Sequence, residues 1–273
     1  MPGSGPLETV KLGQLEVTRL VIGGNPFSGF SHQGDDRDRE MLSYYTADRI
    51  KETLRLAEAA GINTLFARAD RHIVRTLYEY RDEGGTIQWV AQTATDTPDP
   101  LMNIPFARRW GADACYLHGG QTEYFLSNGQ GGKIVEAVKL IRDLGVPAGV
   151  AGHRADHHDW IRQHVDCDFQ MCCYYNSSDR SKDPAHHPTY DECFVEADRD
   201  RMVETIARLG ERPAVHYKIL AAGRTDPEAA FRFAGSAIRP QDVVCVGFYL
   251  PDNPGMIDED IALFNRYCAA GRS

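Results

Sequence analysis

Polar and titratable side chains recur where short apolar runs of this chain end. They include amides, imidazoles, cations and a carboxylate, which are groups that enzymes use to bind hydroxyl-rich or anionic substrates and to move protons. In chain order they are Asn25, Arg68, Asp70, His72, Gln92, His118, His153, Arg154, Tyr175, Asn176, His216 and Lys218. If the apolar runs are strands of one barrel, these residues converge on one pocket although they lie far apart in sequence.

Two of these residues are candidate catalytic groups. His118 directly follows the apolar run at residues 114–117, where an imidazole can act as an acid or a base; a buried structural histidine is the alternative. Lys218 lies in an otherwise apolar stretch, where a lysine is costly unless it is paired or exposed at a pocket mouth. It could bind an anion, act as a base or form an imine, and we rank anion or hydroxyl binding above imine formation.

A second set of residues is expected to bind substrate. Arg68 and Gln92 would hold polar or anionic groups together with Lys218, and the ring of Tyr217 could stack on a flat ligand or simply pack. Asn25 and Tyr175 would line the pocket mouth. The full set is Asn25, Arg68, Gln92, Tyr175, Asn176 and Tyr217.

A divalent metal is the main open question at this pocket. Asp70, His72, His118 and His153 have the side chains that bind Zn, Mn or Fe, and together they would make a site of three or four ligands. The chain has no tight ligand motif such as HExxH, however. In the alternative interpretation, Asp70 caps a helix and His72 lies on the surface of that helix.

The elements that position these residues follow from the alternation of apolar runs and amphipathic stretches. A hairpin is expected at residues 10–17. Eight strand candidates follow it, at residues 20–22, 64–67, 87–93, 114–118, 146–152, 169–175, 214–220 and 243–248. Helical patterns lie between them, as at 46–60, where Thr46 is the expected N-cap, and at 70–83. Eight such units in one chain predict a closed (β/α)8 barrel, an α/β fold, forming one domain over residues 1–273. Two long polar loops, 27–45 and 176–198, would lie on its catalytic face.

Composition excludes several classes of protein. Of 273 residues, 42% are hydrophobic and 25% are charged, which is ordinary for a globular protein. The 39 acidic against 30 basic side chains give a net charge of −9, which argues against nucleic acid or an anionic membrane as a partner. The chain has no apolar run long enough to span a bilayer and no signal-peptide pattern at its start. Seven cysteines without scaffold-like spacing indicate reduced thiols, and we therefore expect a cytoplasmic protein.

Several segments resemble the aldo-keto reductase family. VKLGQLEVTRLVIGGN (10–25) is similar to that family's N-terminal hairpin and first strand, and AEAAGINTLFARAD (57–70) is similar to its second strand region. DACYLHGG (113–120) resembles the strand that ends in the family's catalytic histidine. The later strands match in order at 146–153, 168–176, 216–223 and 242–253. The resemblance covers most of the chain and implies a barrel with an N-terminal hairpin.

The same resemblance implies that the family's reductase chemistry is lost. These enzymes transfer hydride from a nicotinamide cofactor with a tyrosine acid assisted by lysine, aspartate and histidine. His118 keeps the histidine position, but Phe66, Arg71 and Gln92 fall at or near the other three. The Ser-Asn pair that contacts the cofactor is replaced by Ala151 and Gly152. NADPH binding is therefore not expected.

The sequence as a whole favours a non-redox enzyme. We expect a lyase, isomerase or hydrolase that acts on a small polar, sugar-like or anionic substrate, with His118 as acid or base and with a divalent metal as an open possibility. An atypical NADPH-dependent aldo-keto reductase and a non-catalytic ligand-binding barrel are the alternatives. The sequence does not define an oligomeric state.

Overall fold

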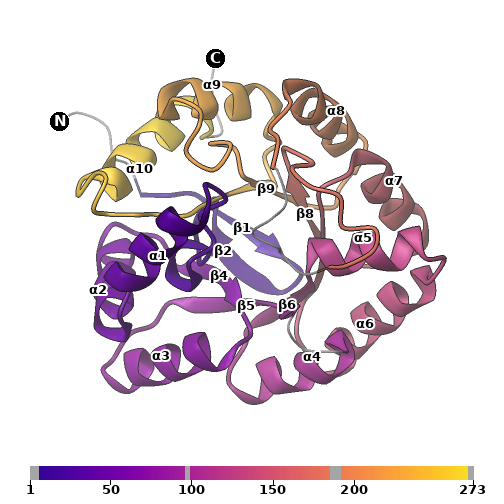
Figure 1. The fold of residues 1–273 in the computed structure, drawn as a ribbon, viewed down its shortest axis with the longest axis horizontal. Coiled ribbons are helices and arrows are strands. Elements are labelled where there is room, and N and C mark those ends of the chain that lie inside the picture. Colours follow the sequence, from indigo (N-terminus) through magenta and orange to yellow (C-terminus); the bar gives the residue numbers. More distant parts are fainter. Residues whose placement is uncertain (1–5, 96–98, 185–191, 270–273) are drawn as a thin grey trace.

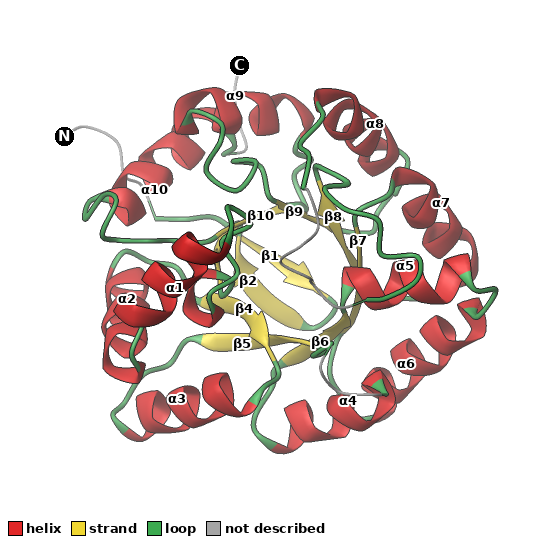
Figure 2. Cartoon of the chain, in the orientation of Figure 1, coloured by secondary structure: helices red, strands yellow, loops and turns green. Residues whose placement is uncertain are grey.

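The computed structural model describes residues 6–95, 99–184 and 192–269, and it contains a closed barrel of eight parallel strands (Figures 1 and 2). Each strand pairs with its neighbours in chain order, and the last strand pairs with the first. The barrel strands are β3 (Leu20–Gly23), β4 (Thr64–Arg68), β5 (Gln88–Gln92), β6 (Ala114–Leu117), β7 (Ala148–Gly152), β8 (Phe169–Cys173), β9 (Ala214–Tyr217) and β10 (Val243–Val246). All eight strands coincide with apolar runs predicted as strands, so the (β/α)8 prediction is confirmed.

Helices surround the barrel (Figure 2). They are α1 (Asp35–Tyr44), α2 (Ala47–Ala59), α3 (Arg71–Asp82), α4 (Pro100–Arg109), α5 (Gly119–Ser127), α6 (Gly131–Asp143), α7 (Ala155–His164), α8 (Glu196–Ala207), α9 (Pro227–Ala237) and α10 (Met256–Tyr267). The expected cap is present, since the Thr46 side chain accepts a hydrogen bond from the Arg49 N–H. Two helices, α1 and α5, are additions within the connections after β3 and β6. The expected loop at 27–45 therefore contains a 3-10 turn (Pro26–Ser28) and a helix.

The predicted hairpin is present and closes one end of the barrel. Strands β1 (Thr9–Leu12) and β2 (Leu15–Thr18) pair antiparallel, with Val10 opposite Val17. Leu12 and Val17 are fully buried, and they join the cluster of side chains that fills the barrel interior, including Phe66, Tyr116 and Phe169. Because the hairpin packs on this interior cluster, the open end of the barrel is the opposite one, where the carboxyl ends of the strands meet.

The side chain of His216 does not enter the barrel. Neighbouring Val215 and Tyr217 pack in the interior cluster, so alternation along β9 directs His216 outward. There it is fully buried, with Nδ1 2.9 Å from the Tyr174 hydroxyl and Nε2 3.2 Å from Asp242 Oδ2. His216 therefore links β9 to the residues around Asp242 and Tyr174. The prediction that its side chain lies in the pocket was wrong. Among the described residues, no helix is long and apolar enough to cross a membrane.

Candidate active site

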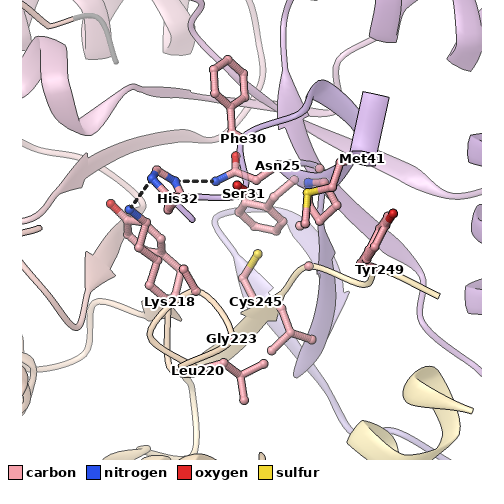
Figure 3. Close-up of a pocket in the computed structure, with 18 of the residues that line it drawn as sticks. Asn25, Phe30, Ser31, His32, Met41, Lys218, Leu220, Gly223, Cys245 and Tyr249 are labelled. Atoms are coloured by element: carbon pink, nitrogen blue, oxygen red, sulfur yellow. Dashed lines mark hydrogen bonds between the residues drawn. The ribbon is translucent and has the colours of Figure 1, made fainter. Parts of the chain in front are cut away.

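A cavity with two adjoining chambers, which share part of their lining, opens at the carboxyl ends of the strands. The larger, apolar chamber has a volume of about 220 Å³ and includes Phe66, Tyr116, Met171 and Cys245 in its lining. The smaller, polar chamber has a volume of about 50 Å³. The lining residues that both chambers share are Asn25, Phe30, His32, Gln92, Tyr217 and Lys218. Figure 3 shows this boundary, with the side chains of Asn25, His32 and Lys218 in a row.

His118 lies in the polar chamber as a neutral ring. It is the N-cap of α5, and its Nδ1 accepts a hydrogen bond of 3.0 Å from the Gly120 N–H. A backbone N–H can only donate, so Nδ1 carries the lone pair and the ring proton is on Nε2. Burial lowers the pKa of His118 well below its usual value, and the positive charges of the surrounding residues lower it further. His118 therefore presents an N–H donor to the chamber.

His153 has the opposite tautomer. Its backbone N–H and its Nδ1 lie 2.9 and 2.8 Å from the same carboxylate oxygen, Oε1 of Glu123. The carboxylate accepts from Nδ1–H, which leaves the lone pair on Nε2. Burial lowers the pKa of His153 well below its usual value, and the positive charge of the nearby Arg180 lowers it further. Burial also raises the pKa of Glu123, so a proton taken up at Nε2 can be shared across the pair through Nδ1.

Two arginines give the polar chamber its positive charge. Arg180 is almost completely buried, and although its Nη2 lies 3.5 Å from Glu192, its Nε and Nη1 have no hydrogen-bond partner among the described residues. The half-buried guanidinium of Arg68 lies over the Phe30 ring and 3.4 Å from Asp70. Buried guanidinium nitrogens without partners are costly, and an anion in the chamber would satisfy them.

The predicted substrate-binding residues divide into two groups. Asn25, Gln92 and Tyr217 line both chambers, and Arg68 lines the polar one. Tyr175 and Asn176 line neither chamber. The Tyr175 ring instead packs edge-on against Phe194, with 5.4 Å between ring centres.

The four expected metal ligands are not brought together. Asp70 caps α3 by accepting from the Ile73 N–H, and His72 is exposed on that helix, as in the alternative interpretation. Only His118 and His153 of the set line the cavity. Across residues 6–95, 99–184 and 192–269, the structure contains no group of three His, Cys, Asp or Glu side chains arranged to hold a metal ion.

Sequence reasoning missed four residues of the site, which are His32, Glu123, Arg180 and Glu192. His32 and Arg180 lie in the two long loops that were expected to cover the pocket. Their position in these loops is the only feature of the sequence that points to a place in the site. Glu123 is a helix residue that looks solvent-exposed in the sequence, yet its side chain is only 3% exposed. The second long loop, predicted at 176–198, is described only in part, because residues 185–191 lie outside the described residues.

Comparisons with known proteins define the fold. No protein-family model matches the chain, and no curated protein matches it. Among solved structures, a candidate aldo-keto reductase from Pseudomonas aeruginosa, PA4992, is similar with a TM-score of 0.62 and 17% identity, over 96% of this chain and 95% of that chain. The Gox0644 protein is similar with a TM-score of 0.60 and 12% identity, over 95% and 89% of the two chains.

Barrels of other classes are similar as well. A truncated 3-deoxy-D-arabino-heptulosonate 7-phosphate synthase from Thermotoga maritima has a TM-score of 0.53 and 13% identity, over 96% of this chain and 89% of that chain. The chain is a (β/α)8 barrel. At such low identity these matches show the fold alone, because one barrel fold serves many unrelated chemistries.

Proposed function

We propose that this protein is a non-redox enzyme, a lyase or isomerase, that removes a proton next to the carbonyl group of a small anionic substrate. The observation that carries the proposal is the pair of buried, neutral histidines with opposite tautomers in one chamber, His118 as donor and His153 as acceptor. Two neutral groups of opposite polarity can act at once on a carbonyl oxygen and on a neighbouring C–H bond.

In this reaction His153 Nε2 takes the proton from carbon, and the bonding electrons move onto the carbonyl oxygen. The Glu123 carboxylate stabilises the positive charge that develops on the ring of His153. His118 Nε2–H donates to the developing oxyanion, and the cations of the chamber stabilise its charge. Return of the proton to another carbon would complete an isomerisation. Return of the electrons from oxygen with loss of a hydroxyl group from the β carbon, protonated to water by His153, would complete a lyase reaction.

The substrate's anionic group would bind Arg180 and Arg68. Arg180 contributes two nitrogens that have no hydrogen-bond partner in the part of the chain that the structure describes, in a chamber of about 50 Å³. This volume suits one carboxylate-sized group and is too small for a whole sugar. The remainder of the substrate would extend past Lys218 and Tyr217 into the larger chamber. Sugar-like compounds with an anionic end fit this description, in keeping with the expectation from the sequence.

We also interpret the chain as a divergent relative of the aldo-keto reductases. The matching segments and the barrel similarity to PA4992 support this relationship. At the tetrad positions, the Phe66 ring packs in the barrel interior and Gln92 lines both chambers. The resemblance therefore accounts for the scaffold, whereas the proposed chemistry depends on Glu123 and His153.

Hydrogen–deuterium exchange tests the proposal. The protein is incubated in deuterated buffer with α-keto acids of increasing chain length and with dihydroxyacetone, and loss of the proton next to the carbonyl is followed by NMR. We expect exchange by the wild type, and a decrease of about a hundred-fold in His153→Gln. The control His164→Gln changes an exposed histidine of α7 and should match the wild type.

Exchange that is equally fast in His153→Gln, or absent with every carbonyl compound, would refute the proposal. Consumption of NADPH with the same compounds would instead favour the atypical reductase.

A further inference from the structure

Lys218 occupies an unusual backbone position between the two chambers. It follows β9 directly and has a φ of 56°, in the left-handed region that non-glycine residues avoid. Ala221 and Ala222 share this conformation, and the Ala221 N–H donates to the Lys218 carbonyl at 2.9 Å. The turn places the lysine side chain where both chambers meet, opposite His32 (Figure 3). Such strained positions concentrate at functional sites.

The amine of Lys218 has weak partners in this position. Its Nζ lies 3.5 Å from His32 Nδ1, but that nitrogen lies 2.9 Å from the Glu192 carboxylate and uses its proton there. The Ser177 hydroxyl is also 3.5 Å away. Among the residues that the structure describes, no carboxylate lies within ion-pair distance of Nζ, so a protonated Lys218 would be a poorly compensated buried charge.

Another lysine of the same chain shows the contrast. Lys51 forms ion pairs with three carboxylates, at 3.1 Å from Asp48, 3.7 Å from Glu79 and 2.5 Å from Glu83, and its pKa is raised. Burial lowers the pKa of Lys218, and the nearby charge of Arg180 acts in the same direction. The surroundings of Lys218 thus favour the neutral amine, which is the nucleophilic form.

We propose that Lys218 is a catalytic nucleophile that forms an imine with the carbonyl group of the substrate. This rests on the proposed function and deepens it, because an iminium carbon withdraws electrons from the neighbouring C–H or C–C bond more strongly than a carbonyl does. The substrate class becomes an anionic aldehyde or ketone whose carbonyl carbon reaches the boundary between the chambers.

The step balances with groups in the cavity and one proton from solution. The lone pair of Lys218 Nζ forms the C–N bond while the carbonyl π electrons move to oxygen, which accepts a hydrogen bond from His118 Nε2–H. The added nitrogen gives one proton to His153 Nε2, and His153 passes that proton to the oxygen, so that a neutral carbinolamine forms. The His153–Glu123 pair then takes up one proton from solution and delivers it to the hydroxyl group, which leaves as water while the nitrogen lone pair forms C=N. The product is an iminium that keeps one Nζ–H and the positive charge, and its hydrolysis after the reaction reverses these transfers.

Reductive trapping tests this proposal. The wild-type protein is incubated with pyruvate or with dihydroxyacetone in the presence of cyanoborohydride, which delivers hydride to an imine carbon and fixes the substrate as a secondary amine. Peptide mapping then compares the six lysines, which are Lys11, Lys51, Lys133, Lys139, Lys182 and Lys218. We expect labelling of Lys218 at least ten-fold above the exposed Lys139 with one of the two probes, and its loss on prior addition of an unlabelled competitor, α-ketobutyrate.

Matched variants separate this proposal from the one on which it rests. The mass that the trapped substrate adds to the protein should be lost in Lys218→Met and kept in Lys139→Met. Circular dichroism should show that both variants are folded. His153→Gln should still accumulate the adduct at Lys218, more slowly than the wild type because His153 also moves protons during imine formation, while its proton exchange falls about a hundred-fold. Trapping without exchange in the wild type would leave the imine standing and overturn the acid–base assignment. Labelling of Lys218 no greater than that of Lys139 with both probes would overturn the imine.

Discussion

The role of a histidine depends on which ring nitrogen keeps its lone pair. At His118 the backbone of α5 fixes that nitrogen as Nδ1, and at His153 the Glu123 carboxylate leaves it as Nε2. The sequence identified both histidines, because each follows an apolar strand. It could not assign their roles, because those roles depend on Gly120 N–H and Glu123, partners that only the fold brings close.

The pH dependence of proton exchange follows from the lowered pKa of His153. A base acts when it is deprotonated, and burial holds the pKa of this group well below the usual 6.5. Exchange should therefore stay at its plateau as the pH falls through 6.5 and decline only at lower pH. The measurement is the exchange rate against pH with one substrate, and an acid limb centred at or above 6.5 would disagree with the neutral, buried ring.

At the scale of elements, the start of α5 determines how the site is assembled. Gly119 and Gly120 bring the helix backbone against the catalytic side chains, because a Cβ on Gly119 would lie 2.8 Å from His153 Cε1 and one on Gly120 would lie 2.9 Å from Arg180 Cδ. The His118-Gly119-Gly120 segment was visible in the sequence only as a strand end. The requirement for small residues arises from contacts with β7 and with the loop after β8.

Gly119→Ala should therefore impair catalysis with the fold preserved. The added methyl group displaces the His153 ring, and a displacement of about 1 Å at a reacting group can lower a rate by as much as a hundred-fold; we expect a decrease in exchange of at least ten-fold. Gly132→Ala, in the first turn of α6 and facing open space, is the control. Equal exchange rates in these two variants would show that the close approach at α5 is unimportant.

The elements themselves were largely predictable from sequence. Strands such as β7 and β8 are buried on both faces and appear as continuous apolar runs, and Thr46 and Asp70 mark two helix starts by their capping side chains. Helix α1 was missed because its only buried residue is Met41, which leaves little apolar periodicity. The expectation that Tyr175 and Asn176 line the cavity was wrong, because the Tyr175 ring packs against Phe194, a contact between distant parts of the loop after β8 that the sequence does not reveal.

At the scale of the whole molecule, a buried network holds the last barrel strands together. Asp242 accepts hydrogen bonds from the Ala214 N–H at the start of β9, from the Arg239 side chain and from His216. Burial alone would raise the pKa of Asp242, but the hydrogen bonds from His216 and Arg239 outweigh it and hold the pKa at about 2. Its contribution to stability is therefore complete above its ordinary value of 3.8 and is lost as the pH falls through about 2.

Asp242→Asn should destabilise the barrel. An amide in place of the carboxylate turns an N–H group toward the Arg239 donors and leaves a buried cation uncompensated, so we expect a loss of about 3 to 5 kcal/mol in the free energy of unfolding. Urea denaturation measures this. Asp143→Asn, at an exposed ion pair of α6, should change stability by less than about 0.5 kcal/mol, and a similar small change for Asp242→Asn would contradict the role of the network.

The charge of the whole chain contrasts with that of its cavity. The protein has a net charge of −9, yet the polar chamber is lined by the guanidinium groups of Arg68 and Arg180. Because these two cations are shielded from bulk water, their field is weakly screened inside the chamber, whereas the acidic groups of the surface are screened by solvent and salt. This local excess supports a small anion as the ligand, which the overall acidic composition did not predict.

The measurement that tests the central claim most directly is long-range ¹H–¹⁵N NMR of the protein labelled with ¹⁵N-histidine, with His118→Gln and His153→Gln to assign the signals. It needs no substrate. At neutral pH we predict two neutral rings of opposite tautomer, with the proton on Nε2 in His118 and on Nδ1 in His153. Two rings of the same tautomer, or an imidazolium at either position, would contradict the assignment of donor and base.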